Sequence, residues 1–442
     1  MEHMSSIAQL LCISVEESLK TGFSLSEIEQ EIRRQMVEAG RQALTQCLEN
    51  RQEKYPAEAC PCPGCGEDAA YVRQRKGTLR TTLGQVKYQR SYYLCDNCHQ
   101  GTYPLDNQLG LRPNEMSAEL ERLGGMVGVE MSFGKGSNLF TELTLVPLSN
   151  HSLDKAAQAY GREVEKVEAE WKMEAQNQTA LQKRQQEARR PLRLYGSMDG
   201  VKVHIRGDKE HPWRDLKIGA WFEARGRPPR HPDGEWHIQA ENISYYADIC
   251  PSLEFSPLFW ATGVQHNAHL AQELVVLGDG AEWIWNLVAA NFPKAVQIVD
   301  WFHACEYFAP VAKAAFADKQ LQEKWIAKTK TALWEGRLDE VIAACQTHVC
   351  PKRRDDPAQK AVTYFSNNRS RMDYPDYRAN GYQIGSGTIE SAAKQIGSLR
   401  MKVPGAIWNE DGARYVAKAR AAYLSGQWNS IAQRRTHLPF AI

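Results

Sequence analysis

The 442-residue sequence lacks both features that direct a chain into or across a membrane. No stretch approaches the roughly eighteen consecutive apolar residues of a membrane-spanning helix. The N-terminal run MEHMSSIAQLLCISVEESLK has no basic start followed by a long apolar segment, so no signal peptide is expected. We therefore expect a cytoplasmic protein.

An excess of charge of one sign is also missing. The chain has 54 Lys and Arg against 53 Asp and Glu, so its net charge makes no case for nucleic acid. The stretches 182–230 and 391–442 are locally basic and suit phosphate contacts, although composition alone favours solvated surface. There is no Gly-x-Ser-x-Gly motif, and Cys305 has no recognisable oxyanion partner. These absences argue against a serine or cysteine hydrolase.

Cysteine, in contrast, is abundant, with eleven residues in a chain of cytosolic character. Disulfides are rare in that compartment, so a metal site is the better explanation. Two CxxC pairs in the β-rich segment 55–103 predict a zinc ribbon with one structural Zn²⁺ on Cys62, Cys65, Cys95 and Cys98. Cys60 is a spare thiol, and a Cys60/Cys65 pairing is the weaker alternative.

Whether the ribbon touches DNA is a separate question, because many ribbons are purely structural or bind proteins. Its candidate phosphate contacts are Lys76, Arg80, Lys87 and Arg90. The helices that follow, 116–164, are spaced like a helix-turn-helix unit, a pattern that any three-helix bundle shares. Lys135 and Lys155 are candidate phosphate contacts there.

Apolar spacing predicts two helical regions on either side of the ribbon. Residues 5–50 are expected to be helical, with Ser26 and Glu29 as a capping box. Residues 116–190 are expected to form two shorter helices and then a long one, 153–190, with Ser152 as its N-cap.

After Pro191 the pattern changes to strands, and the element order predicts a mixed α/β sheet. The runs ELVVLG and AVQIV are short, apolar and non-alternating, which is typical of parallel strands buried on both faces. The expected elements are strands at 192–205, 215–226 and 237–249, a helix at 262–273, a strand at 273–278, a helix at 283–292, a strand at 295–299, and helices over 304–345 and from 387.

Four acidic residues stand where a sheet of this kind binds ligands. Asp199 lies inside a run suited to a central strand, where an isolated charge must be paired, protonated or bound to metal. Asp279 and Asp300 end the two apolar strands, at the edge where open α/β sheets bind ligands. Glu390 opens a helix after a Gly-Ser-Gly turn. Three such carboxylates can hold two Mg²⁺ ions, whereas each acid alone also suits a turn or an N-cap.

These residues lie in strings that resemble the signature blocks of Mutator-like bacterial DDE transposases, best the Kra-type insertion-sequence branch. The strings are SMDGVKVH, VVLGDGAEWIWNLVAANFPKAVQIVDWFHACEYF and IGSGTIESAAKQIGSLRMKVPGAIW, together with the CPCPGCG of the ribbon. The resemblance covers about residues 55–425 and implies an RNase H-like catalytic domain with a helical insertion.

The resemblance also implies roles for individual residues. Asp199, Asp279 and Glu390 match the catalytic triad that binds two Mg²⁺ ions, for which Mn²⁺ can substitute. Topology alone does not choose between Asp279 and Asp300, and the resemblance favours Asp279. Asp300 and His303 match a supporting Asp-x-x-His element, in which His303 orients a catalytic group or braces the strand end.

The implied substrate is double-stranded DNA at the transposon ends and the target, bound by at least a homodimer. Candidate DNA contacts are Lys394, Arg400, Lys402 and the insertion residue Trp334, although tryptophan at helical spacing is more often core. Two rivals remain open: a zinc-ribbon DNA-binding regulator with an inert α/β domain, and an RNase H-like nuclease or resolvase that cuts without joining.

The expected organisation is multidomain. It comprises an N-terminal helical segment (1–50), the zinc ribbon (51–112), a helix-turn-helix-like bundle with a linker helix (113–190), an α/β RNase H-like catalytic domain in two parts (191–309 and 379–427) around an all-helical insertion (310–378), and a basic tail (428–442).

Overall fold

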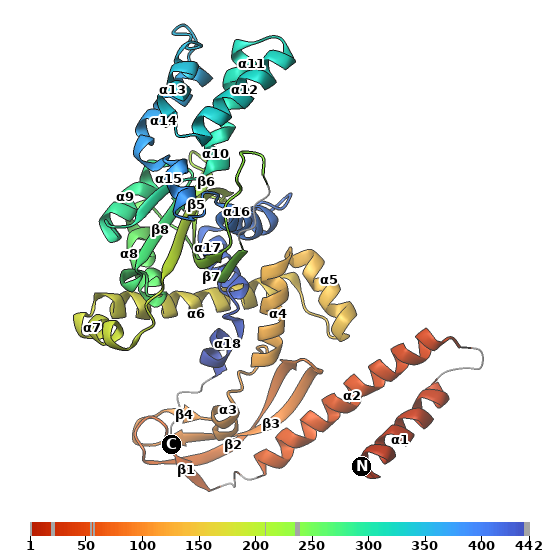
Figure 1. Ribbon diagram of the computed structural model, residues 1–442. Helices are drawn as coiled ribbons and strands as arrows, with labels where there is room; N and C mark the ends of the chain where they lie inside the picture. The colour runs from red at the N-terminus through yellow and green to blue at the C-terminus, as the bar shows by residue number, and fades with distance from the viewer. Residues whose placement is uncertain are drawn as a thin grey trace. The chain divides into compact units, whose positions relative to one another are not determined.

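A computed structural model describes residues 2–18, 23–53, 55, 58–207, 209–234 and 239–436. The chain forms two compact units (Figure 1). Unit 1 comprises Met1–Tyr160 and Asn429–Ile442, and unit 2 comprises Gly161–Trp428. The predicted multidomain, mixed α/β character is confirmed, since each unit combines helices with its own sheet.

Unit 1 is built around a four-stranded antiparallel sheet in the order β1-β2-β3-β4. Its strands are β1 (Ala59–Pro61), β2 (Asp68–Thr81), β3 (Gly84–Cys95) and β4 (Gly101–Thr102), and its helices are α1 (Glu2–Ser18), α2 (Leu25–Gln52), α3 (Pro104–Leu109), α4 (Ala118–Glu130), α5 (Phe133–Thr144), the first part of α6 (Asn150–Gln176) and most of α18 (Trp428–Thr436). Leu48 of α2 and Leu105 of α3 form one core with Leu79, Val86 and Tyr88 of the sheet.

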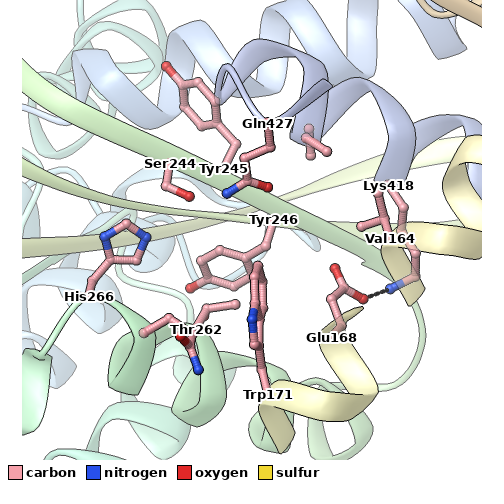
Figure 2. A pocket seen from close by; sticks show the side chains of 13 residues that line it. Val164, Glu168, Trp171, Ser244, Tyr245, Tyr246, Thr262, His266, Lys418 and Gln427 are labelled. Atoms are coloured by element: carbon pink, nitrogen blue, oxygen red, sulfur yellow. Dashed lines mark hydrogen bonds and ion pairs between the residues drawn. The ribbon is translucent and has the colours of Figure 1, made fainter. Parts of the chain in front are cut away.

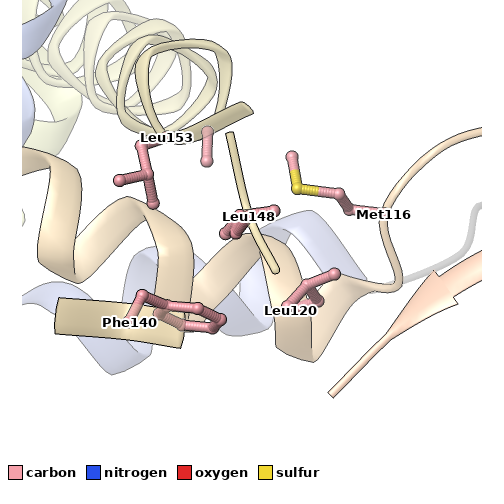
Figure 3. Packing of buried hydrophobic residues seen from close by; sticks show 6 residues of the cluster. Met116, Leu120, Phe140, Leu148 and Leu153 are labelled. Atoms are coloured by element: carbon pink, nitrogen blue, oxygen red, sulfur yellow. The ribbon is translucent and has the colours of Figure 1, made fainter. Parts of the chain in front are cut away.

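The helices α4, α5 and α6 enclose a separate small core in unit 1 (Figure 3). Its buried side chains are Met116, Leu120, Phe140, Leu148, Leu153 and Ala156. The helix α4 begins at a capping serine, Ser117, whose hydroxyl accepts from the backbone N–H of Leu120. A bundle with its own core explains why the apolar spacing of 116–164 predicted helices.

Both predicted helix caps were misplaced by a few residues. The capping box of α2 is formed by Ser24 and Glu27 rather than by Ser26 and Glu29. Ser24 has the extended backbone of an N-cap, whereas Ser26 already lies within the helix. Likewise α6 begins at Asn150, and the Ser149 hydroxyl accepts from the backbone N–H of Ser152.

Unit 2 contains a five-stranded sheet in the order β7-β6-β5-β8-β9. The strands β5 (Arg193–His204), β6 (Trp213–Arg225) and β7 (Gln239–Ile249) are antiparallel, while β8 (Glu273–Gly278) and β9 (Val296–Val299) run parallel to β5. The predicted parallel pairing of ELVVLG and AVQIV is therefore confirmed.

Helices cover both faces of this sheet. On one face, Trp221 of β6 stacks on Phe259 of α8 (Ser252–Gln265), near α9 (Glu282–Asn291). On the other face lie α16 (Gly387–Ala392), the π-helix η3 (Ala393–Met401) and α17 (Glu410–Leu424). A Cβ at Gly397 would lie 2.9 Å from Val201, so η3 approaches β5 closely enough to require glycine there.

The remaining helices of unit 2 include the predicted insertion, which extends from one end of the sheet (Figure 1). They are α7 (Gln178–Glu187), η1 (Ala268–Leu270), α10 (Trp301–Glu306), α11 (Phe308–Ala315), α12 (Lys319–Trp334), α13 (Leu338–Gln346), α14 (Pro357–Asn367), η2 (Arg369–Arg371) and α15 (Tyr374–Ala379). The helix expected at 262–273 is α8, which begins at Ser252. Pro251 and Pro257 had obscured its start, because proline normally interrupts a helical pattern.

A buried ionic cluster joins three elements of unit 2, and Figure 2 shows its contact between Lys418 and Glu168. The ammonium group of Lys418, on α17, lies 2.5 Å from Glu168 of α6 and 2.7 Å from Asp248 of β7. The Lys418 side chain is only 1% exposed. Burial alone lowers the pKa of Lys418, but the two carboxylates outweigh burial and raise this pKa above its usual value.

We expect Lys418→Met to lower the free energy of unfolding of unit 2 by about 3 to 5 kcal/mol, because two buried carboxylates lose their counter-ion. The matched control is Lys319→Met on α12, whose exposed ion pair with Glu323 contributes less than about 1 kcal/mol. Urea unfolding followed by tryptophan fluorescence measures both. Equal effects of the two substitutions would show that the buried cluster does not hold the elements together.

Candidate metal centre and acidic site

The four predicted cysteines lie together at one end of the sheet in unit 1. Cys62 and Cys65 belong to the turn after β1, whereas Cys95 ends β3 and Cys98 lies in the next turn. Their four Sγ atoms all lie within 4.8 Å of one another, so they are able to hold a metal ion. Cys60, on β1, is not part of this group, and the alternative Cys60/Cys65 pairing is not the arrangement found.

Backbone amide groups of the first CxxC turn stabilise a thiolate. The N–H of Gly64 donates to Sγ of Cys62 at 3.4 Å, and this contact is the main cause that lowers the pKa of Cys62 to about 7. A thiolate is the form of cysteine that binds metal. The turn therefore favours the metal-binding form of one of the four candidate ligands.

The acidic site lies in unit 2, where the strand registers bring three aspartates to one level. Ser197 of β5 pairs with Leu277 of β8, and the same register continued by two residues sets Asp199 beside Asp279. Gly278 of β8 pairs with Val299 of β9, so the next residues, Asp279 and Asp300, are also neighbours. Asp279 and Asp300 thus follow the carboxyl ends of β8 and β9, while Asp199 lies within β5, two residues past its last pair with β8.

Glu390 reaches this site from α16, on the face of the sheet toward which Asp199 points. Asp199 and Val201 alternate with Gly200 and so share a face of β5, and Val201 packs against Gly397 of η3. Burial raises the pKa of Asp199, and the nearby charges of Asp279 and Glu390 raise it further. Asp279 and Glu390 thus both act electrostatically on Asp199.

The three carboxylates are near one another without being in ligand contact. Among the described residues, the four cysteines form the only group of three or more candidate ligands within 4.8 Å. Asp279 and Glu390 instead have local partners: Asp279 accepts from the N–H of Ala281 at 2.8 Å, and Glu390 accepts from the Ser386 hydroxyl at 3.0 Å.

Asp300 is buried, with 1% exposure, and connects the strand end to the loop before Glu390. One carboxylate oxygen accepts from the N–H of His303 at 2.5 Å and caps α10, and the other accepts from the N–H of Ser386. The sequence showed that Asp300 ends a strand but not that it holds Ser386, a residue far along the chain. Burial is the main cause that raises the pKa of Asp300 to about 6.

This shift predicts a pH dependence of stability. The folded state holds the Asp300 proton up to about pH 6, whereas the unfolded chain releases it near the ordinary pKa of 3.8. The stabilisation is therefore complete below about pH 4 and is lost as the pH rises to 6, by roughly 2 to 3 kcal/mol. In Mg²⁺-free urea unfolding, the stability advantage of the native protein over Asp300→Asn should shrink over that interval. A constant difference would contradict the shift.

Two tyrosines that the sequence did not single out line the acidic site. The hydroxyl of Tyr364, on α14, donates to the backbone carbonyl of Asp279 at 2.8 Å. Its ring stacks on Tyr307 with 4.0 Å between the centroids. Gly280 has φ +98°, and a Cβ there would lie 2.6 Å from the Tyr364 ring, which explains the Asp-Gly sequence at the strand end.

His303 follows Asp300 on α10 and lies half-exposed near this cluster. Its Nδ1 is 3.5 Å from Glu306, and its ring is 6.3 Å from that of Tyr364. His303 also contributes to the electrostatic surroundings of Asp199. His303 thus lies near the acidic residues. Its role, orienting a catalytic group or bracing the strand end, stays a prediction.

The four candidate DNA contacts divide into two buried and two exposed residues. Trp334 is 5% exposed, lies against Trp301 and has the Arg378 guanidinium 3.9 Å from its ring centroid. Arg400 is 1% exposed and lies over the Trp408 ring. These placements give no support to DNA contacts by Trp334 or Arg400. Lys394 and Lys402 are exposed and remain candidates.

A family model matches most of the chain, over residues 18–210 and 264–435. Its description is Uncharacterised protein family (UPF0236). The chain belongs to this family. The matched residues include the four cysteines, the three aspartates of the sheet edge and Glu390, whereas the unmatched segment covers β6, β7 and nearly all of α8.

No curated protein matches the chain. Among the described helices, none combines the length and apolar character needed to cross a membrane.

Proposed function

We propose that the chain is a DDE transposase that binds the ends of a bacterial insertion sequence, hydrolyses phosphodiester bonds and transfers the freed 3′-hydroxyl ends to target DNA. The observation that carries the proposal is the grouping of Asp199, Asp279 and Glu390 at one edge of a five-stranded sheet. The sheet order, with three antiparallel strands followed by two parallel ones, supports an RNase H-like catalytic unit.

The acidic site suits Mg²⁺, because carboxylate oxygens are the ligands that this hard cation prefers. Asp199, Asp279 and Glu390 would hold two ions, and Mn²⁺ would substitute. Bound ions would activate the attacking water or 3′-hydroxyl and stabilise the leaving oxygen. Burial first, and repulsion from Asp279 and Glu390 second, raise the pKa of Asp199, which supports a site that a bound cation would help to ionise.

Neighbouring groups hold Asp279 and Glu390 in place before DNA binds. Asp300 anchors Ser386, and the Ser386 hydroxyl donates to Glu390. Tyr364 holds the backbone of Asp279 through its hydroxyl group. Such pre-orientation lowers the entropic part of the activation barrier, so Asp300, Ser386 and Tyr364 act as positioning residues.

The group of four thiols in unit 1 fits one tetrahedral Zn²⁺. In this proposal, the ion is structural and maintains the end of the sheet formed by the two CxxC turns. Unit 1 then presents its surfaces to DNA while unit 2 performs the chemistry. Transposition joins two DNA ends, so we infer at least a homodimer on DNA in the bacterial nucleoid, with 153–190 as a candidate contact.

The test is strand cleavage and joining with labelled DNA that carries the element ends, in the presence and absence of Mg²⁺. The proposal expects 3′-hydroxyl ends at the element boundary and joined products with target DNA, both dependent on Mg²⁺ or Mn²⁺. Cleavage chosen by DNA structure, without joining, would instead identify a nuclease or resolvase. Binding without any cleavage would identify a DNA-binding regulator.

A further inference from the structure

The hairpin of β2 and β3 in unit 1 is strongly basic. Between Ala69 and Leu94 the sequence has no Asp or Glu, and its six cationic residues are Arg73, Arg75, Lys76, Arg80, Lys87 and Arg90. Since the net charge of the whole chain is only +1, this concentration on one two-stranded ribbon is a local property.

Three of these cations already have protein partners. Arg90 forms an ion pair with Asp106 and lies over the Tyr103 ring. Arg80 donates to the Ser152 hydroxyl at 2.9 Å. Arg75 lies 4.4 Å from the Tyr92 ring centroid. Their positions are explained by the fold of unit 1.

Lys76 and Lys87 differ from these three. Both side chains are exposed, and neither has an ion-pair partner within the described part of the chain. Lys76 pairs with Gln89 and Lys87 with Thr78, so the two lysines share one face of the ribbon. The residues of the opposite parity, such as Leu79 and Val86, are buried in the core of unit 1.

The face that carries the two lysines is polar over its whole length. Arg80 and Ser91 also lie on this face but are bound to Ser152 and Gln52. Its other residues from Gln74 to Gln89 are Gln74, Lys76, Thr78, Gln85, Lys87 and Gln89, which we call the ribbon face. Amides and a hydroxyl group are able to hydrogen-bond to base edges, and ammonium groups are able to neutralise phosphates. These groups therefore suit a polyanionic partner that presents polar groups within a groove.

We propose that the ribbon face binds the major groove of double-stranded DNA, with Lys76 and Lys87 against phosphates. The major groove of B-form DNA admits a two-stranded β-ribbon, whereas that of A-form RNA is too narrow for side chains to read. The inference rests on the proposed function because that function supplies the partner, DNA. It does not depend on whether the protein cleaves or joins DNA. The ribbon holds the duplex, and the acidic site of unit 2 takes no part in this contact.

The experiment measures DNA binding by the full, zinc-loaded chain without Mg²⁺, by fluorescence anisotropy over a range of salt concentrations. The variant Lys76→Gln/Lys87→Gln is compared with Lys319→Gln/Lys324→Gln, which removes the same charge from exposed positions of α12 in unit 2. Loss of two phosphate contacts should reduce the slope of log affinity against log salt by about 2. Affinity for duplexes of unrelated sequence should fall roughly tenfold, while the control keeps native values.

Zinc content and circular dichroism of each variant establish that it is folded. A native salt slope in the ribbon variant would overturn the proposal, as would a greater loss of binding to duplex RNA than to duplex DNA. Glucosylated DNA, whose sugars fill the major groove, should bind the native chain weakly, and undiminished binding would exclude this groove. A chain that binds through the ribbon but never cuts would contradict only the proposed transposase activity.

Discussion

Asp279→Asn is expected to abolish both strand cleavage and strand joining, with a loss of rate on the order of 10³-fold or more. The amide keeps an oxygen that can accept from the N–H of Ala281, so the turn at the end of β8 is preserved. The substitution removes the negative charge with which Asp279, together with Asp199 and Glu390, would bind cations. The measurement is single-turnover cleavage of labelled element-end DNA with Mg²⁺.

The matched control is Asp339→Asn on α13, an acid whose side chain is 85% exposed and which pairs with Arg369 in the insertion. The control should cleave and join like the native protein. Asp300→Asn should retain some activity, because its carboxylate acts through Ser386 rather than on DNA. If Asp279→Asn cuts normally while Asp300→Asn is inactive, the second catalytic acid has been assigned to the wrong strand.

Cys95→Ser is expected to abolish zinc binding and to unfold one end of the sheet in unit 1. The apolar cluster at that end is small, with only Cys62, Ala69, Tyr93 and Cys95 buried. Structural zinc sites contribute roughly 10 to 16 kcal/mol of apparent binding free energy to folding, more than such a cluster supplies. Metal analysis should find one Zn²⁺ in the native chain and none in the variant.

Hydrogen exchange locates the damage from Cys95→Ser. Protection should be lost in β1 and in the adjoining part of β3, while the helical core around Leu120 and Leu153 stays protected. Cys60→Ser is the control, since Cys60 lies on β1 of the same sheet but outside the four-cysteine group. Loss of zinc from Cys60→Ser would instead support the alternative Cys60/Cys65 pairing.

Local patterns in the sequence predicted much of the fold correctly. The apolar runs ELVVLG and AVQIV became parallel strands β8 and β9 because continuous burial on both faces requires such runs. The two CxxC pairs became one thiol group because a ribbon brings such turns together. Errors arose where two residues satisfied the same local rule, as at Ser24 and Ser26 before α2.

Contacts between distant segments were beyond the reach of such patterns. Lys418 read as a surface cation in a basic stretch, yet it is buried between Glu168 and Asp248. Arg400 and Trp334 likewise read as candidate DNA contacts, yet both side chains are buried. Local sequence does not predict whether a charged or aromatic residue is buried or exposed, because the residues that pack against it come from other parts of the chain.

The sequence by itself determined which residues have the chemistry for metal: four thiols in two turns, and acids at strand ends. Both follow from short-range spacing. Only the tertiary structure decided how Asp199, Asp279 and Asp300 align and that Ser386 connects Asp300 to Glu390. Strand register and burial depend on packing between segments far apart in the chain, and packing is a property of the whole folded unit.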